Sequence, residues 1–295
     1  MLSILIPTYN YNIFPLVLEL RNQSEKLDFE YEIIVLDDFS KLYLTENQQV
    51  NNLINCSFEI LQHNIGRSAI RNLLAKKAKF ANLLFLDADT MPQHSNFIKN
   101  YFFQINEIQN VVYGGIVYQK QKPQKKQLLR WIYGQKREAL SVINRQKNEY
   151  LSFLTLNFMI SKSVFETIRF NENMPNLRHE DTLFSFDLKQ KNIKICHIDN
   201  PVFHFGIESS LIFIKKSEEA LDNLFFLIQN QLIDKQYLKI SKLYFLFKKY
   251  RVIYPFSLFF DCTKPIFLWQ LQSNMPSILV FDLYRLCYLC KNFKN

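Results

Sequence analysis

Asp87 and Asp89 are the residues of this chain whose type and spacing most directly suggest chemistry. They follow the apolar run Leu83–Leu86 and are separated by a single alanine. Two ionised carboxylates cannot be buried without partners, so both are expected where a buried strand ends and the chain leaves the sheet. Hard oxygen ligands there suit Mg²⁺ or Mn²⁺, which commonly bridges to substrate phosphates. In the other interpretation Asp89 simply caps a following helix, as Asp often does.

The first ninety residues alternate between apolar strand-like runs and amphipathic helical stretches. This alternation predicts parallel βαβ units, hence an α/β fold with a mostly parallel central sheet in an αβα sandwich. Right-handed crossovers bring the carboxyl ends of parallel strands to one edge, where ligands bind in open sheets. The predicted strands are Leu2–Ile6, Glu32–Leu36, Phe58–Leu61 and Leu83–Leu86. The polar residues that follow them are Tyr9, Asp38, Asn64 and Asp87.

Further candidate residues lie in the second half of this region, where strands are expected over 111–118, 193–198 and 201–205. Gly114-Gly115 interrupts the first of them, and such pairs mark close approach of a ligand or of another backbone. Glu180 and Asp181 come just before a helix expected from about Leu183 to Lys191. In the other interpretation Asp181 is only a first-turn carboxylate that interacts favourably with the helix dipole. His204 is either a metal ligand, since imidazole suits Mn²⁺, or a hydrogen-bonded core residue.

Composition restricts the class of protein. A net charge of +9 fits phosphorylated substrates, anionic membranes or nucleic acid. We recognise no nucleic-acid-binding signature, so nucleic acid is not expected as a partner. Five cysteines form no even disulfide framework, and Cys287 and Cys290 are expected to be buried thiols in a reducing compartment. We recognise no signal peptide, and the apolar segment 252–269 carries charges and prolines that disfavour spanning a bilayer. The expected location is the cytoplasm.

With these residues identified, the chain resembles the family-2 glycosyltransferases over residues 1 to about 206. The resemblance rests on several short motifs in the family's order. They are Ser3–Asn10, Ile33–Ser40 with its Asp37-Asp38 pair, Asn64-x-Gly66 followed by Arg71-Asn72, Leu86–Asp89, and Glu180-Asp181. It implies a two-lobed GT-A fold that uses a nucleotide sugar.

The resemblance also implies roles for individual residues. Asp89 would hold a Mn²⁺ or Mg²⁺ ion on the donor diphosphate, with Asp87 reaching the same ion or the ribose. Asp181, next to Glu180, would be the general base that takes a proton from the acceptor hydroxyl. His204 remains a candidate metal ligand. The residues implied to line the nucleotide site are Pro7, Tyr9, Asp38, Asn64, Gly66, Arg71 and Asp87.

The implied activity is inverting, metal-assisted transfer of a sugar from a UDP-sugar to a hydroxyl of a glycan or lipid-linked acceptor. Two departures stand out. Phe39 occupies a position where the family often has glycine, so the turn after Asp38 is expected to differ. The motif of processive, membrane-embedded members is absent after Asp181, which favours non-processive transfer. Two other classes stay open: a nucleotidyltransferase acting on sugar phosphates, and a non-catalytic nucleotide-sugar-binding protein.

We expect a glycosyltransferase domain over residues 1–208, with a nucleotide-sugar half at 1–90 and an acceptor half at 91–208. Residues 209–295 are expected to form a helical C-terminal region. Leu279, Leu283, Leu286 and Leu289 recur there at helical spacing. Either this stripe packs against the rest of the chain or a second copy in a homodimer, or it makes a peripheral contact with anionic lipid on the inner face of the membrane.

Overall fold

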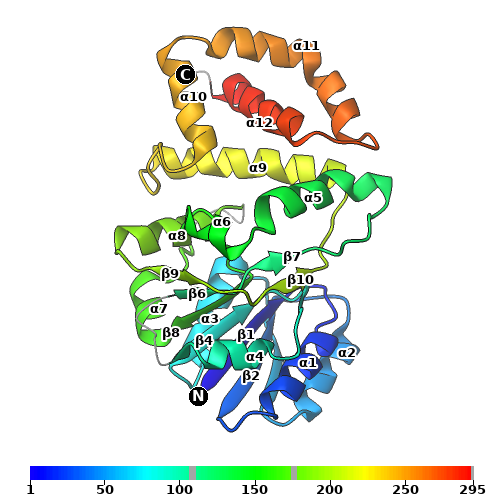
Figure 1. The fold of residues 1–295 in the computed structure, drawn as a ribbon, viewed down its shortest axis with the longest axis vertical. Coiled ribbons are helices and arrows are strands. Elements are labelled where there is room, and N and C mark those ends of the chain that lie inside the picture. The colour runs from blue at the N-terminus through cyan, green and yellow to red at the C-terminus, as the bar shows by residue number, and fades with distance from the viewer. Residues whose placement is uncertain (106–110, 174–177, 294–295) are drawn as a thin grey trace. The chain divides into compact units, whose positions relative to one another are not determined.

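The computed structural model describes residues 1–105, 111–173 and 178–293 (Figure 1). These residues form two compact units. The sheet unit comprises Met1–Tyr118, Ala139–Asn176 and Glu180–Gly206, and the helical unit comprises Gln119–Glu138, Leu177–His179 and Ile207–Asn295.

The sheet unit is built on seven strands in the order β3-β2-β1-β4-β8-β6-β9. The first four neighbours pair in parallel, as β6 and β9 do, while β8 runs antiparallel to both β4 and β6. The predicted α/β class with a mostly parallel sheet and a helical C-terminal region is confirmed. The strand bounds are β1 Leu2–Thr8, β2 Tyr31–Asp37, β3 Cys56–Ile60, β4 Asn82–Leu86, β6 Val111–Tyr113, β8 Asn157–Ser161 and β9 Ile195–His197.

Helices cover both faces of this sheet because its central strands are apolar on both sides. Along β1, Ile4 and Ile6 point into one core cluster and Leu5 into the other, as the two-residue period of a strand requires. The first cluster packs on α1 (Phe14–Ser24) and α4 (Phe97–Phe102). The second packs on α3 (Arg67–Lys77), α7 (Lys162–Ile168) and α8 (Glu180–Gln190). A short helix α2 (Leu44–Gln48) follows β2.

A second, three-stranded sheet of β5 (Thr90–Pro92), β10 (Val202–His204) and β7 (Ile116–Val117) lies beside the carboxylate segment. β10 runs antiparallel to β5 and puts His204 opposite Thr90. A β-carbon on Gly115, which has φ +96°, would lie 2.9 Å from the guanidinium of Arg145. Gly115 therefore admits a buried arginine of the same chain, on α6 (Val142–Gln146). A β-carbon on Gly114 would lie 2.4 Å from the backbone carbonyl oxygen of Asn200, so this glycine allows the close approach of another backbone, as predicted.

The helical unit contains four long helices and the segment 119–138. The segment 124–148, which reads as one helical stretch, is broken into α5 (Leu128–Tyr133), a π-helical turn (Gly134–Glu138) and α6. Cys287 and Cys290 are free and fully buried, as predicted. Among the helices described, none is long and apolar enough to cross a membrane. The long helices are α9 Ser210–Gln229, α10 Lys239–Lys249, α11 Ile253–Leu271 and α12 Ile278–Asn292.

Candidate functional site

The predicted strand ends meet where the strand order of the sheet reverses. β1 lies between β2 and β4, so the connections from these strands leave in opposite directions, and in open sheets the carboxyl ends at such a point are where ligands bind. Tyr9 follows β1 and is 56% exposed, while Pro7 lies within β1 opposite Leu36. Asp87 follows β4, and its backbone N–H donates to the carbonyl of Leu156.

Asp38 binds the loop that follows β3. Its Oδ1 accepts the N–H of Ile65 at 2.7 Å and its Oδ2 that of Gly66 at 3.0 Å. The side chain of Asn64 in turn donates to the carbonyl of Asp38 at 3.0 Å. Three of the predicted nucleotide-site residues are thus brought together, with the carboxylate directed at the protein's own backbone.

The turn after Asp38 keeps the conformation of a glycine although the residue is phenylalanine. Phe39 has φ +68°, in the left-handed region that a side chain makes unfavourable. Its ring lies 3.7 Å from Nζ of Lys41, and Ser40 accepts the N–H of Asn10 through its hydroxyl. The turn is therefore left-handed at a residue that carries a side chain, at the cost of strain, offset in part by the cation–π contact. A difference from the family's turn stays a prediction.

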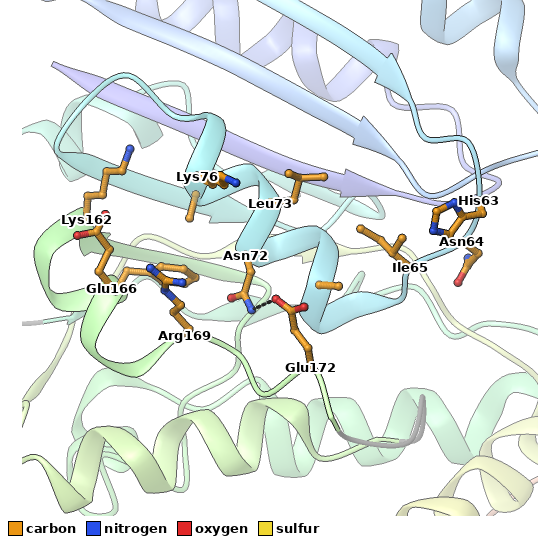
Figure 2. Close-up of a pocket in the computed structure, with 13 residues that line it drawn as sticks. His63, Asn64, Ile65, Asn72, Leu73, Lys76, Lys162, Glu166, Arg169 and Glu172 are labelled. Carbon is orange, nitrogen blue, oxygen red and sulfur yellow. Dashed lines mark hydrogen bonds between the residues drawn. The ribbon is translucent and has the colours of Figure 1, made fainter.

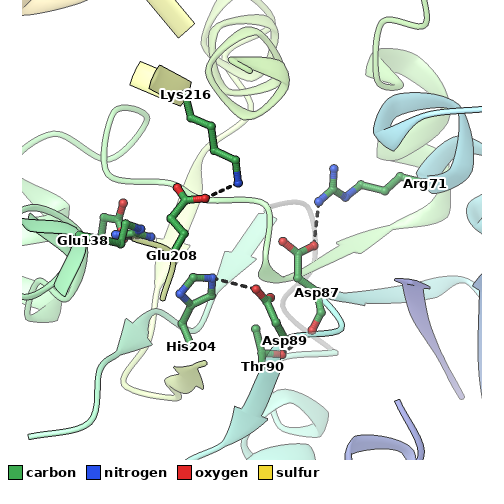
Figure 3. Close-up of polar contacts among 9 residues, drawn as sticks. Arg71, Asp87, Asp89, Thr90, Glu138, His204, Glu208 and Lys216 are labelled. Atoms are coloured by element: carbon green, nitrogen blue, oxygen red, sulfur yellow. Dashed lines mark hydrogen bonds and ion pairs between the residues drawn. The ribbon is translucent and has the colours of Figure 1, made fainter. Parts of the chain in front are cut away.

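Arg71 joins the two acidic motifs. Its side chain is 5% exposed and donates to Oδ1 of Asp87 at 2.7 Å (Figure 3). It also lies 3.8 Å from Oε1 of Glu180. The residues it connects come from the end of β4 and the start of α8. A buried guanidinium is stable only beside such carboxylates. Burial by itself would lower the pKa of Arg71, but the charges of Asp87 and Glu180 have the larger combined effect and raise it.

Glu180 and Asp181 are adjacent carboxylates with opposite pKa shifts. The cations Arg67 and Arg71 lower the pKa of Glu180 against its burial. Burial, followed by the charge of Glu180, raises the pKa of Asp181 to about 6. Oδ1 of Asp181 accepts the backbone N–H of Thr182 at 2.7 Å. A carboxyl with a pKa near 6 is better matched to accept a proton near neutral pH than an ordinary aspartate is.

Asp89 and His204 face each other beside this cluster. Nε2 of His204 lies 3.2 Å from Oδ2 of Asp89, and Nδ1 of His204 is buried without a hydrogen bond (Figure 3). Two ligands on adjacent positions of an octahedral ion, each about 2.1 Å from it, lie about 3 Å apart, so this pair fits Mg²⁺ or Mn²⁺. Within the described residues, no group of three His, Cys, Asp or Glu side chains is arranged to hold a metal ion. Asp87 is directed to Arg71 instead.

A separate cavity of about 800 Å³ opens between α3 and α7 (Figure 2). Asn64 lines it, but Asp87, Asp89 and Asp181 do not. Asn72, which belongs to the same motif as Arg71, also lines this cavity. Its side-chain amide donates to Glu172 and to the carbonyl of Phe170 and so has a structural role there. The carboxylates lie instead at the end of β4 and at the start of α8.

Three residues of the site were missed from the sequence. Arg67 contacts Glu180 at 3.4 Å and stands one helical turn before Arg71, a spacing that could have revealed it. Tyr11 is the second: burial, followed by the charge of Asp89, raises its pKa. Gly206 packs directly against the carboxylate of Asp89. It is one of only five glycines in the chain, and this scarcity could have marked it as a position that requires glycine.

Comparison with solved structures gives several weak matches. The chain is 21% identical to S. aureus TarS 1-349, with a TM-score of 0.49, and the match covers 75% of this chain and 64% of that one. For S. aureus TarS the identity is 20% and the TM-score 0.49, and the match covers 75% of this chain and 39% of that one. For S. aureus TarS 1-349 in complex with UDP-GlcNAc the identity is 21% and the TM-score 0.49, and the match covers 75% of this chain and 66% of that one. The chain thus spans less than two thirds of the first two chains. No curated protein matches it.

The model of the family described as "Glycosyl transferase family 2" matches residues 3–169. That range is more than half of the chain and contains the strand ends of β1, β2, β3 and β4, with Asp38, Arg71, Asp87 and Asp89. The protein belongs to glycosyl transferase family 2.

Proposed function

We propose that this protein is an inverting glycosyltransferase that moves a sugar from a UDP-sugar to a hydroxyl of a glycan or lipid-linked acceptor. The observation that carries the proposal is the position of Arg71 between Asp87 and Glu180. One guanidinium can contact both only if the carboxylates after β4 and those at the start of α8 share one crevice. Donor-binding and proton-accepting groups would then be within reach of the same anomeric carbon.

The donor would occupy the crevice at the ends of β1, β2 and β4. Pro7 and Tyr9 would border the base, and the Asp38–Gly66 contacts would fix the loop beside it. Asp89 and His204 would hold Mn²⁺ or Mg²⁺, with the remaining positions left to the diphosphate and water. Such an ion, when bound, neutralises the charge that builds up on the departing diphosphate.

Asp181 would act as the general base. Glu180 is kept ionised by Arg67 and Arg71, and its fixed negative charge helps to hold the pKa of Asp181 near 6. The carboxylate would accept the proton of the acceptor hydroxyl while the oxygen attacks the anomeric carbon from the face opposite the diphosphate. The new glycosidic bond forms as the bond to UDP breaks, so the configuration inverts, and the proton remains on Asp181 until it passes to solvent.

Release of UDP from a panel of UDP-sugars, with and without hydroxyl acceptors, tests this proposal. We expect release with one donor, stimulated by acceptor and by Mn²⁺ or Mg²⁺. Pyrophosphate formation from a sugar phosphate and a nucleoside triphosphate would instead identify a nucleotidyltransferase. Tight UDP binding without turnover for any donor and acceptor would identify a binding protein.

The metal assignment has its own test. Asp89→Ala and His204→Ala should each weaken UDP binding in the presence of Mn²⁺, while His63→Ala, an exposed histidine beside α3, should not. Full activity of the wild-type protein in the presence of a strong chelator would refute the role of the metal.

A further inference from the structure

Helix α11 is apolar on two opposite faces, and only one of them is packed. Phe260, Phe267 and Leu271 point into a core cluster shared with α12 and α9. The opposite arc holds large apolar side chains that are exposed to solvent. Their exposed fractions are 63% for Tyr254, 66% for Leu258, 44% for Phe259, 63% for Ile266 and 75% for Trp269.

These side chains form one continuous surface. At 3.6 residues per turn, Tyr254, Leu258 and Trp269 lie along one line of the helix, and Phe259 and Ile266 lie beside it. In Figure 1 α11, in orange, runs along the border of the helical unit, with α12 on its inner side. We call this surface the α11 face. A contiguous apolar patch of this kind on a soluble domain marks an interaction site.

The positive charge of the protein is concentrated in the unit that carries the α11 face. The helical unit contains 20 Lys and Arg residues against 8 Asp and Glu, whereas the sheet unit contains 16 against 19. The net charge of +9 therefore comes from the helical unit alone. The neighbouring helix α10 carries exposed apolar residues beside lysines, among them Leu243 and Leu246 with Lys242 and Lys249, and exposed Tyr250 follows its last residue.

A basic cavity adjoins the end of the α11 face. It has a volume of about 690 Å³ and is lined by Trp269, Lys125, Lys126 and the first turn of α9. Ser209 caps that helix by accepting the N–H of Ile212. Two lysines and a helix N-terminus provide donors suited to a phosphate group, next to an indole ring.

We propose that the helical unit binds the surface of an anionic phospholipid membrane through the α11 face, with headgroup phosphate at Lys125 and Lys126. An interfacial helix combines exposed Trp, Tyr and Leu side chains with surrounding cations, as this unit does. A second copy on the same face would bring two basic units together and gain no charge complementarity. Of the two interpretations of the leucine stripe of α12, packing within the chain is the one that fits: Leu286 and Leu289 are buried, and Leu279 alone of these four is strongly exposed.

Vesicle flotation of the full chain tests this proposal without any sugar donor, so its outcome is independent of the transferase activity. We expect binding to vesicles of phosphatidylcholine mixed with phosphatidylglycerol, little binding to phosphatidylcholine alone, and release by high salt. Leu258→Ser combined with Trp269→Ser should lower partitioning about tenfold or more, because two apolar side chains no longer enter the interface. Lys125→Glu combined with Lys126→Glu should lower it about tenfold.

Matched controls come from the sheet unit. Ile54→Ser with Ile143→Ser removes two apolar residues that are 69% and 71% exposed, and Lys26→Glu with Lys147→Glu reverses two exposed lysines. Both should bind vesicles as the wild type does. Absence of binding to anionic vesicles, equal binding to uncharged ones, or full binding by the α11 variant would overturn the proposal. So would a dimer in analytical ultracentrifugation that the α11 variant dissociates.

Discussion

A β-carbon at residue 206 would lie 2.0 Å from Oδ2 of Asp89, so only glycine allows this carboxylate its present position. The same β-carbon would lie 3.2 Å from Nε2 of His204. Gly206 therefore fixes the space in which the two candidate metal ligands face each other.

Gly206→Ala should displace Asp89 and weaken Mn²⁺-dependent UDP binding about tenfold, with little effect on UDP binding in chelator. Isothermal titration with and without Mn²⁺ measures both. In an Asp89→Ala background the same substitution should have no further effect on metal-dependent binding. Equal losses with and without the metal would show that residue 206 acts on the fold and not on this pair.

Arg71→Met should destabilise the protein by about 2–4 kcal/mol, because it leaves Asp87 and Glu180 close together without their buried cation. Urea denaturation gives the free energy of unfolding. Arg67→Met is the matched control: its side chain is 58% exposed, so the loss should be below about 0.5 kcal/mol. Similar losses for the two variants would contradict the central position given to Arg71.

Gly115→Ala should cost about 2–4 kcal/mol of stability. The residue has φ +96°, and an added β-carbon would press on the Arg145 guanidinium, which donates to the carbonyls of Tyr113 and Ile198. Thermal and urea denaturation of the variant check this. A stability equal to that of the wild type would mean that Arg145 moves aside without loss of these contacts.

Asp181→Asn should stabilise the protein at neutral pH. Folding raises the pKa of Asp181 from 3.8 to about 6, so the folded state binds the proton more tightly than the unfolded state does. The resulting destabilisation is absent below about pH 3.8 and fully present above about pH 6. Removing the charge should therefore gain on the order of 1–3 kcal/mol at pH 7.5 and almost nothing at pH 4. A loss of stability at pH 7.5 would contradict the raised pKa.

The local part of this architecture could be predicted from the sequence. Strands β1, β2 and β4 are apolar on both faces, so their positions and the polar residues at their ends could be predicted from pattern alone. The antiparallel insertion of β8 between β4 and β6 could not, because pairing between residues 82–86 and 157–161 is a tertiary choice that leaves no local signal. The residue pattern of 94–108 also indicates a helix. The helix described there, α4, is shorter at Phe97–Phe102, and residues 106–110 lie outside the described part of the chain.

Sequence patterns also could not predict features that depend on contacts made only in the folded chain. Phe39 keeps a left-handed turn that sequence reasoning reserves for glycine, because neighbouring contacts of Ser40 and Asn10 hold the backbone in place. The exposed face of α11 could not be predicted, since periodicity cannot tell a packed face from an exposed one when both are apolar. The pairing of Arg71 with two distant carboxylates likewise required the fold.

Turnover and UDP affinity of Asp181→Asn, measured side by side, test the central claim most directly. Asp187→Asn is the control, since Asp187 lies on the same helix and its pKa is also raised to about 6, by burial. Wild-type kcat/KM should fall as the pH drops through about 6, because Asp181 becomes protonated. We predict that Asp181→Asn lowers kcat about 100-fold or more while UDP binding and the Asp187→Asn control stay near wild type. Wild-type turnover in Asp181→Asn, or loss of UDP binding in parallel with activity, would contradict its role as the base.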